Sequence, residues 1–285
     1  MPPQSIAILF LERDRPEAYV VSELTRYWRE DGLSVQFLFG TKNHVPADLL
    51  FLHVNLSVVP ENYLDFARRY PCCVNLVVRD IRKHSFSSLL LTPDSNYPGP
   101  VIVKTDLNCG GDPERRLHPH LFTRFAHRWQ YRFRPGRGDA LYSTYSSLRE
   151  VPPACWRDPG LVIEKFVPER IGDDYAVRTY HFLGNQEAFF LLKGREPIVK
   201  GETVTETVAF KPDPRLSDIR RRLGFDYGKF DYVLLDGQPV LLDLNKTVGL
   251  LPNYQRDPHV EKARRLRAKG IYNLLDRCEG RRDNC

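Results

Sequence analysis

The sequence predicts a mixed fold, α/β followed by α+β, with a small parallel α/β domain at the N-terminus and antiparallel sheets after it. Two patterns lead to this prediction. Short apolar runs alternate with helix-like segments over roughly the first 95 residues, which is typical of a parallel sheet. After a turn-rich segment that begins near Thr92, the apolar runs come in pairs separated by short turns, which is typical of antiparallel hairpins.

The N-terminal domain is predicted from four strands and two helices. The first strand is the apolar run Ser5–Leu11, and the helix-like segment Pro16–Asp31 follows it and ends at Gly32, a residue suited to a helix C-terminus. The other elements are strands at 34–39, 49–54 and 72–78 and a helix at 61–70. Because no glycine follows the first strand, the fingerprint of a dinucleotide-binding fold is absent.

The rest of the chain is predicted to be antiparallel α+β. Its expected strands are 101–104, 161–166, 175–182, 187–192, 230–235 and 239–244. The tail 260–276 has the pattern of a basic amphipathic helix that packs on the rest of the molecule.

The composition is that of a globular protein without a membrane span. Hydrophobic residues make up 42% and charged residues 27% of the chain, which excludes a disordered protein. No apolar run approaches the roughly 20 residues that span a bilayer, and the first residues lack the pattern of a signal peptide, so we expect a cytoplasmic protein. The six cysteines match no metal-knuckle spacing, and we expect reduced thiols, with Cys72 and Cys73 in the core.

Basic residues concentrate in one segment. Seven arginines and no acid lie between Arg115 and Arg137, in a chain whose net charge is +6. Several aromatic residues lie among them, so the segment could bind nucleic acid, phosphates or an acidic substrate. A solvated helix face followed by a loop explains the same pattern equally well.

Three oxygen-bearing side chains in residues 229–245 are the strongest chemical signal. Two apolar strands flank an Asp236-Gly237 turn and carry Asp231, Asp243 and Asn245. Asp243 and Asn245 are two residues apart on one strand, so they share a face. One or two carboxylates with neutral oxygens are the ligands of a Mg²⁺ ion that bridges nucleotide phosphates. The alternative is that all three are ordinary polar residues on the solvent-facing edge of a hairpin.

The pairing register of this hairpin decides between the two interpretations. A strict two-residue loop would place Asp231 on the face opposite Asp243. A shift of one residue in pairing, or a bulge at Gly237, would bring the two carboxylates to one face. We expect the shifted register.

This hairpin resembles the closing motif of ATP-grasp enzymes, in which an Asp on one strand is followed by Glu-x-Asn on the next. Three earlier segments resemble the same family in order: Val101–Lys104 with Gly110-Gly111, Leu161–Val167, and Asp174–Arg178. The similarity spans about residues 75–252. It implies a pre-ATP-grasp domain at 1–95, a small lid subdomain at 96–167 and a C-terminal subdomain at 168–285 that holds the metal-binding hairpin.

The resemblance implies a site for ATP and two Mg²⁺ ions. Asp231, Asp243 and Asn245 would hold the metal. The nucleotide would contact Lys104, Gly110, Gly111, Glu164, Lys165 and Val167, with Asp173 or Asp174 at the ribose. Arg178, Lys193 and Lys229 would neutralise charge on the transferred phosphoryl group and the acyl phosphate, and Arg195 and Lys200 compete with Lys193 for its role. Taken singly, Lys104 and Glu164 could be surface residues, and Arg178 an ion-pair partner of Asp174 or Glu187.

The implied activity is ATP-dependent ligation of a carboxylate to an amine or thiol through an acyl phosphate. The substrates would be small molecules or peptides, nucleic acid is disfavoured, and a homodimer is compatible with the family. A phosphotransferase and a non-catalytic nucleotide- or RNA-binding protein are the alternatives. Asp243 stands where the family usually has glutamate, and Lys246–Gly249 where a Pro-Gly turn is common, so the substrate class stays open.

Overall fold

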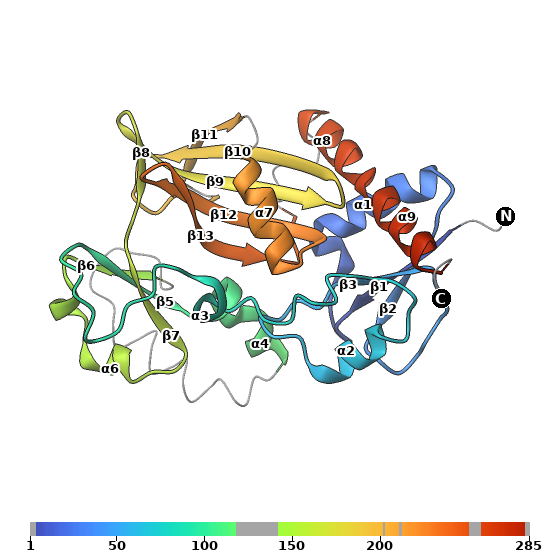
Figure 1. Ribbon diagram of the computed structural model, residues 1–285, viewed down its shortest axis with the longest axis horizontal. Coiled ribbons are helices and arrows are strands. Elements are labelled where there is room, and N and C mark those ends of the chain that lie inside the picture. The colour runs from blue at the N-terminus through green and yellow to red at the C-terminus, as the bar shows by residue number, and fades with distance from the viewer. Residues whose placement is uncertain (1–3, 118–141, 202, 211–212, 251–257, 283–285) are drawn as a thin grey trace.

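The computed structural model describes residues 4–117, 142–201, 203–210, 213–250 and 258–282. In these residues the chain forms a parallel sheet, two antiparallel sheets and the helices that pack on them (Figure 1). The six-stranded antiparallel sheet lies between the parallel sheet, which is near both termini, and a three-stranded sheet at the far end. The predicted mixed fold is confirmed.

The N-terminal sheet is parallel, with the strand order β2-β1-β3-β4. Its elements are β1 (Ser5–Phe10), η1 (Pro16–Ala18), α1 (Val20–Glu30), β2 (Ser34–Phe39), β3 (Leu49–Leu52), α2 (Glu61–Ala67) and β4 (Cys73–Val74). β1 has a neighbouring strand on each side, and every residue from Ile6 to Phe10 is fully buried, as is typical of an inner strand of a parallel sheet. β4 is shorter than predicted because Asn75 takes a positive φ of 62° and turns its amide group to the backbone of Asp226 and Tyr227.

The three-stranded sheet has the order β6-β5-β7 and is antiparallel. Its elements and the helices around it are α3 (Lys83–Phe86), β5 (Val101–Thr105), η2 (Asn108–Gly111), α4 (Asp112–Leu117), β6 (Tyr142–Tyr145), η3 (Leu148–Glu150), α6 (Pro153–Trp156) and β7 (Leu161–Lys165). The chain at Leu89–Leu91 covers the outer edge of β7, since Lys165 donates to Leu89 and Leu91 to Ile163, each at 2.9 Å. Both edges of β7 are therefore occupied.

The six-stranded sheet has the order β11-β10-β9-β12-β13, with β8 paired to β9. Its elements are β8 (Glu169–Ile171), β9 (Asp174–Leu183), β10 (Gln186–Gly194), β11 (Val204–Ala209), α7 (Pro214–Leu223), β12 (Tyr227–Leu235) and β13 (Gln238–Asn245). Tyr180, Phe182, Phe230 and Tyr232 line one face and pack with Leu216 of α7. Full burial of such a side chain stabilises the folded state by about 2 kcal/mol, so the face that carries these side chains points to the core. The intervening residues of β12 therefore face the other way.

The C-terminal tail forms two helices, α8 (Pro258–Ala268) and α9 (Gly270–Arg282), where one was expected. The turn between them is at Lys269, and Gly270, the first residue of α9, lies very close to β9: a Cβ atom at this position would lie 1.9 Å from the carbonyl oxygen of Leu183. α8 packs on α1, and Trp28 donates to the carbonyl of Ala268 at 2.9 Å. The expected packing role of the tail is confirmed.

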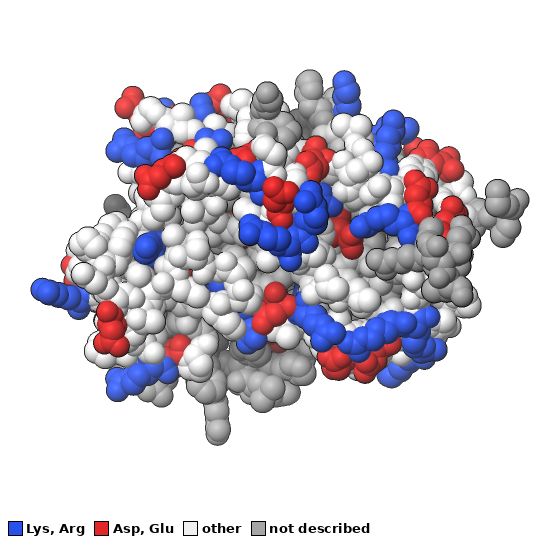
Figure 2. All heavy atoms as spheres, viewed as in Figure 1, with Lys and Arg blue, Asp and Glu red and all other residues white. Residues whose placement is uncertain are grey.

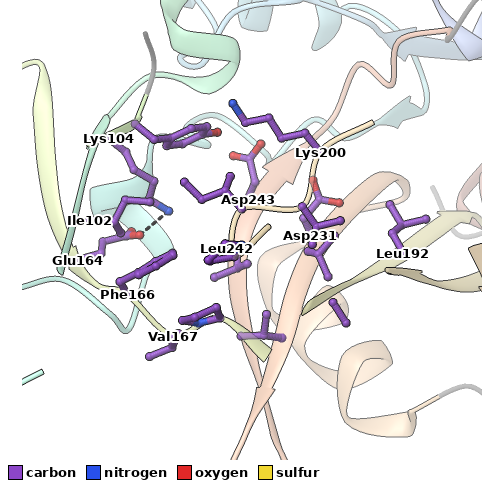
Figure 3. A pocket seen from close by; sticks show the side chains of 18 of the residues that line it. Ile102, Lys104, Glu164, Phe166, Val167, Leu192, Lys200, Asp231, Leu242 and Asp243 are labelled. Atoms are coloured by element: carbon purple, nitrogen blue, oxygen red, sulfur yellow. Dashed lines mark ion pairs between the residues drawn. The ribbon is translucent and has the colours of Figure 1, made fainter. Parts of the chain in front are cut away.

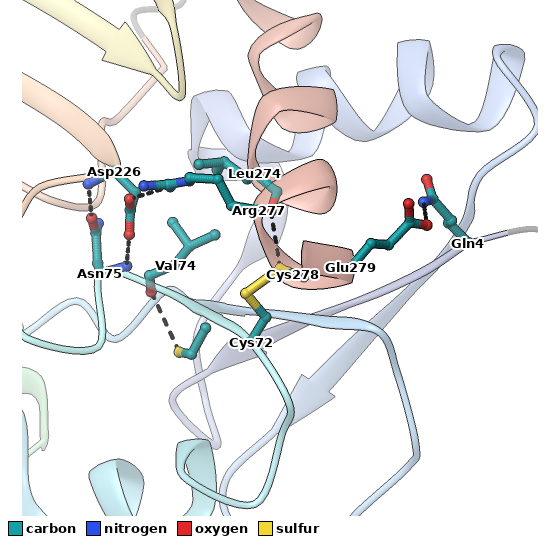
Figure 4. The surroundings of a disulfide bond; sticks show 10 residues. Gln4, Cys72, Val74, Asn75, Asp226, Leu274, Arg277, Cys278 and Glu279 are labelled. Atoms are coloured by element: carbon teal, nitrogen blue, oxygen red, sulfur yellow. Dashed lines mark hydrogen bonds and ion pairs between the residues drawn. A yellow bond between two sulfur atoms is a disulfide. The ribbon is translucent and has the colours of Figure 1, made fainter. Parts of the chain in front are cut away.

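A disulfide corrects the expectation that all cysteines are reduced. Cys72, beside β4, is bonded to Cys278 of α9 across a sequence separation of 206 residues (Figure 4). Because α9 packs its apolar side against the N-terminal core, it brings Cys278 next to a residue far away in the chain. Cys73, Cys109 and Cys155 are free thiols.

The remaining sequence expectations concern membranes and the basic segment. In the described part of the chain, no helix combines the length and the apolar character that a bilayer span requires. Arg115–Arg137 lies outside the described residues except for its first three positions. On the face shown in Figure 2, Lys and Arg are interspersed with Asp and Glu, so the described residues form no extended basic surface on this face. The boundaries at residues 95 and 167 stay predictions.

Candidate functional site

A bulge in the β12–β13 hairpin places Asp231 and Asp243 directly opposite each other. Near the turn the pairing follows a two-residue loop, with Leu235 opposite Gln238 and Tyr232 opposite Leu241. The register then shifts, so that Leu242 is the extra residue and Asp231 pairs with Asp243. The expected shifted register is confirmed, although the bulge lies at Leu242 and the turn at Gly237 is regular.

The two opposed carboxylates have incomplete hydrogen bonding. Asp231 accepts from Lys229 Nζ at 2.8 Å through Oδ2, while its Oδ1 is buried without a hydrogen bond. Oδ1 of Asp243 is also buried without a hydrogen bond, and Lys83 Nζ lies 3.7 Å from it. Burial, together with the charge of Asp243, raises the pKa of Asp231, and Lys229 opposes this shift. Like charges directly across a sheet repel, so this arrangement favours a cation between them.

The donor set fits a hard divalent cation that also binds phosphate. Asn245 lies one pair further along the same face, opposite Lys229, and its Oδ1 accepts from the backbone of Thr247 at 2.8 Å. Among the described residues, no group of three His, Cys, Asp or Glu side chains could hold a metal ion by itself. Two carboxylates and an amide oxygen suit Mg²⁺, which completes its six ligands with water and phosphate oxygens.

Asp231 and Asp243 line a cavity of about 320 Å³ between the six-stranded and three-stranded sheets, whereas Asn245 is not among its lining residues. Figure 3 shows Asp231 and Asp243 on the hairpin, Lys200 extending across the opening, and Lys104 with Glu164 on the opposite wall. The other walls are mainly apolar: Ile102, Phe166, Val167, Ala176, Val177, Leu192, Ile198, Val199, Val233 and Leu242. A small, largely apolar cavity with a few convergent charges is the usual form of a ligand site.

Lys83 lines the cavity and was missed by the sequence reasoning. It is 5% exposed, and its Nζ donates to the carbonyl of Leu107 at 3.1 Å and faces Asp243. Lys83 thus contacts both the β12–β13 hairpin, at Asp243, and the segment just before Gly110-Gly111, at Leu107. No local signal could have identified it, because it lies in the polar run Arg79–His84, which has the composition of a solvated turn.

Lys104 and Glu164 form a buried ion pair in the cavity wall. They lie near each other on the neighbouring strands β5 and β7, and their side chains are 7% and 1% exposed. Glu164 was expected to contact the nucleotide, and in the structure its side chain forms the ion pair that holds Lys104. A buried ion pair fixes the position of a charge without requiring a net gain in stability.

We expect Lys104→Met to lower both nucleotide affinity and stability. The buried Glu164 carboxylate loses its counter-charge, which costs about 3 kcal/mol. Thermal unfolding should show a clear loss, and Lys104→Met/Glu164→Leu should recover most of it while nucleotide affinity stays low. Lys193→Met is the matched control, because its partner Glu206 is exposed and such pairs contribute at most about 1 kcal/mol. Equal stability of Lys104→Met and wild type would contradict the prediction.

The segment after β7 leaves one backbone donor at the cavity. The backbone N–H groups of Lys165 and Phe166 donate to Leu89 and Pro100, each at 2.9 Å. Within the described residues, no hydrogen bond uses the N–H of Val167, which lines the cavity. Val167 therefore offers a free donor between apolar walls, while the side chain of Lys165 lies over the ring of Tyr97.

The glycine pair lies beside the hairpin. Gly110 and Gly111 have φ values of 64° and 75°, which side-chain-bearing residues rarely adopt, and they turn the chain from β5 into α4. Neither lines the cavity, but Cys109 next to them is close enough to Asp243 and Lys83 for their charges to act on its thiol. The loop therefore approaches the site from the side of Lys83.

The structure does not bring Arg178 to the cavity. Arg178 forms a forked ion pair with Glu169, at 2.6–3.0 Å, and stacks over Phe210. Arg178, Tyr180 and Phe182 are every second residue of β9, so their side chains share one face. That face is the one that α7 covers, and it points away from Asp231. The catalytic role expected for Arg178 is not supported. The signal against it in the sequence was its two-residue spacing from these aromatic residues, which places it on their face.

Lys193, Asp173 and Asp174 also lie outside the cavity lining. Lys193 pairs with Glu206 of β11 at 2.7 Å, whereas Lys200, its competitor in the sequence, lines the cavity and lies 4.5 Å from the centre of the Tyr142 ring. Asp173 is an exposed turn residue, and Asp174 pairs with Arg195 at 3.2 Å. Lys200 therefore replaces Lys193 in the candidate site, and neither aspartate is selected for a ribose.

Comparisons with known proteins identify the fold. No model of a protein family matches the chain, and no curated protein matches it in sequence. Solved structures match over nearly its whole length. A D-alanine–D-alanine ligase from Bacillus anthracis has a TM-score of 0.52 at 10% identity, and the match covers 99% of this chain and 100% of the ligase. The structure of this ligase in complex with ATP has a TM-score of 0.51 at 11% identity, and that match covers 99% of both chains.

Two further structures are similar to the same extent. A RimK domain ATP-grasp protein from Sphaerobacter thermophilus has a TM-score of 0.50 at 12% identity, covering 95% of this chain and 98% of its own. The macrocyclase MdnC from Microcystis aeruginosa, bound with precursor peptide MdnA, has a TM-score of 0.52 at 9% identity, covering 94% and 100%. The chain has the ATP-grasp fold.

Proposed function

We propose that this ATP-grasp chain is an ATP-dependent ligase that joins a carboxylate to an amine or thiol. The observation that carries the proposal is the opposed pair Asp231 and Asp243 beneath a cavity whose lining includes Lys83, Lys104, Lys200 and Lys229. Four cations around two carboxylates and an apolar slot suit a triphosphate with its metal ions and its base. Similar structures named as ligases support this choice of reaction.

The residues of the chain have separate tasks in this proposal. The apolar slot beside Ile102 and Leu242 would hold adenine, with the N–H of Val167 as a donor to the ring. Lys104, fixed by Glu164, and Lys83 would bind phosphate oxygens, and Lys200 would cover the terminal phosphate from the opening. The lysines position charge, and none of these groups forms a covalent bond with the substrate.

Asp231, Asp243 and Asn245 would hold Mg²⁺ at the floor of the cavity. When bound, Mg²⁺ neutralises the phosphate oxygens and lowers the barrier to phosphoryl transfer. Lys229 is held by Asp231 and would bind the oxygens of the acyl phosphate that the substrate carboxylate becomes. An amine or thiol then displaces phosphate, so ADP and phosphate form in equal amounts.

Hydroxylamine trapping tests this proposal without knowledge of the natural amine. We expect a panel of carboxylic acids, incubated with Mg-ATP and hydroxylamine, to contain acids that yield a hydroxamate in step with ADP, because hydroxylamine attacks acyl phosphates. Mass spectrometry identifies the hydroxamate and a coupled assay measures ADP.

Two results would contradict the ligase assignment. A stable phosphorylated acceptor with no hydroxamate and no free phosphate would indicate a phosphotransferase. Steep salt-dependent RNA affinity without ATP turnover would indicate a nucleic-acid-binding protein.

A further inference from the structure

A second cavity of about 700 Å³ lies in the N-terminal part of the molecule, apart from the candidate nucleotide site. Its lining comes from the chain after β1, from the chain after β3 and from α4: Leu11, Glu12, Arg13, Asp14, Arg15, Ala18, Tyr19, Asn55, Pro113, Arg116 and Leu117. None of these residues lines the first cavity. The sequence reasoning did not single out this region as a site.

The topology of the parallel sheet explains why a cavity forms here. β1 pairs with β2 on one side and with β3 on the other, so the chain leaves β1 in one direction and β3 in the other. The connections after these two strands therefore diverge at the C-terminal edge of the sheet. Ligands of open parallel sheets bind in the crevice at such a switch point.

Three arginines that form no ion pair with a described residue line this cavity. Among the described residues, no carboxylate forms an ion pair with Arg13, Arg15 or Arg116, and all three are exposed. Other arginines of the chain, such as Arg178 and Arg215, are held by a carboxylate in forked contacts. A guanidinium group binds a carboxylate through two parallel hydrogen bonds, so three free guanidinium groups suit a ligand with more than one carboxylate.

The floor of the cavity offers a fixed acceptor as well. Asp14 accepts through Oδ1 from the hydroxyl of Tyr19 at 2.6 Å and from the N–H of Arg15 at 3.2 Å. Its Oδ2 is buried and has no hydrogen bond. Because buried acceptors are normally satisfied, Oδ2 suits an N–H or O–H group of a ligand.

Hydrogen bonds connect this cavity to the metal hairpin. Asn55 donates to the hydroxyl of Tyr19 and accepts from the hydroxyl of Thr247, each at 2.8 Å. Thr247 donates its backbone N–H to Asn245. The second cavity is thus separated from the end of the hairpin by a single layer of side chains.

We propose that the second cavity binds a small polycarboxylate that also carries an N–H or O–H donor, at a site separate from the proposed nucleotide site. This inference does not depend on the proposed ligase function. Arg13, Arg15 and Arg116 hold the carboxylates, and Asp14 accepts from the donor. A neutral amino acid with one carboxylate, such as L-alanine, would leave two of the three arginines without a carboxylate.

Thermal unfolding without ATP tests the anion site, with citrate and L-glutamate as probes and L-alanine as the neutral comparison. We expect citrate and L-glutamate, but not L-alanine, to raise the melting temperature of the wild-type protein. Arg13→Gln/Arg15→Gln should weaken their apparent affinity about a hundredfold, since the loss of one charge-assisted contact is worth about tenfold. Arg149→Gln/Arg157→Gln is the matched control, because both arginines are exposed and line neither cavity.

Mg-ADP, measured in the same assay, separates this inference from the proposed function. Arg13→Gln/Arg15→Gln should bind Mg-ADP like the wild type. If Mg-ADP stabilises the protein but neither polycarboxylate does, or if both act equally on all variants, the assignment of the second cavity is wrong and the ligase proposal stands. If the polycarboxylates act through the arginines and Mg-ADP does not bind, the anion site stands and the proposed function fails.

Discussion

Asp243→Asn is expected to lower turnover at saturating ATP by about a thousandfold, which corresponds to about 4 kcal/mol of transition-state stabilisation. Asparagine keeps the size of the side chain but removes one of the two charges that hold the cation. Stability without ligands should change little, because the substitution removes the repulsion between two opposed carboxylates and also the attraction between Asp243 and Lys83. Steady-state ADP formation at increasing magnesium concentrations measures the effect on turnover.

Asp236→Asn is the matched control for this substitution. It makes the same chemical change in the turn of the same hairpin, and Asp236 does not line the cavity. Its φ of 51° is one that asparagine accepts readily, so folding should be unaffected. Turnover of Asp243→Asn within about threefold of the Asp236→Asn value would remove the metal site from the proposal.

Loss of the Cys72–Cys278 disulfide should destabilise the folded chain by about 5 kcal/mol. The chain-entropy relation gives this value because the bond closes a loop with a sequence separation of 206 residues. The bond restricts the unfolded chain, so its removal favours unfolding even if the folded contacts stay. Cys72→Ser/Cys278→Ser should therefore melt roughly 10 °C lower than the wild type. Differential scanning calorimetry with and without reductant measures the shift.

Cys109→Ser is the control for the disulfide, because Cys109 is an exposed free thiol. It should melt like the wild type, and reductant should lower the melting temperature of both. Alkylation of the denatured, unreduced protein should leave Cys72 and Cys278 unmodified. Modification of both, with no effect of reductant on melting, would show that the bond does not form.

Much of the candidate site followed from local sequence pattern. The spacing of Asp243 and Asn245 fixed their common face, because side chains alternate along a strand. The requirement that Asp231 join them led to the prediction of a shifted register, and the structure has it. The position of the bulge was not predictable, since Leu242 differs in no local property from the leucines beside it.

Among the charged residues, the structure leaves Arg178 and Lys193 outside the cavity lining and adds Lys83, which the sequence reasoning missed. Arg178 and Lys193 have the charge that a phosphate site needs, but each is held by a glutamate on a neighbouring strand, Glu169 or Glu206. Lys83 was missed because its place in the cavity depends on the packing of α3 against the hairpin. Charge alone therefore did not distinguish phosphate-binding side chains from structural ion pairs.

The sequence by itself determined the order of the sheets, the alternation that buries one face of β12, and the chemistry of the hairpin. These properties depend on residues a few positions apart, where the periods of strands and helices apply. Only the tertiary structure decided which lysines face Asp243, where the second cavity opens and that Cys278 reaches Cys72. Those contacts join segments that are distant in the chain, and their formation depends on how whole sheets and helices pack, which no local pattern encodes.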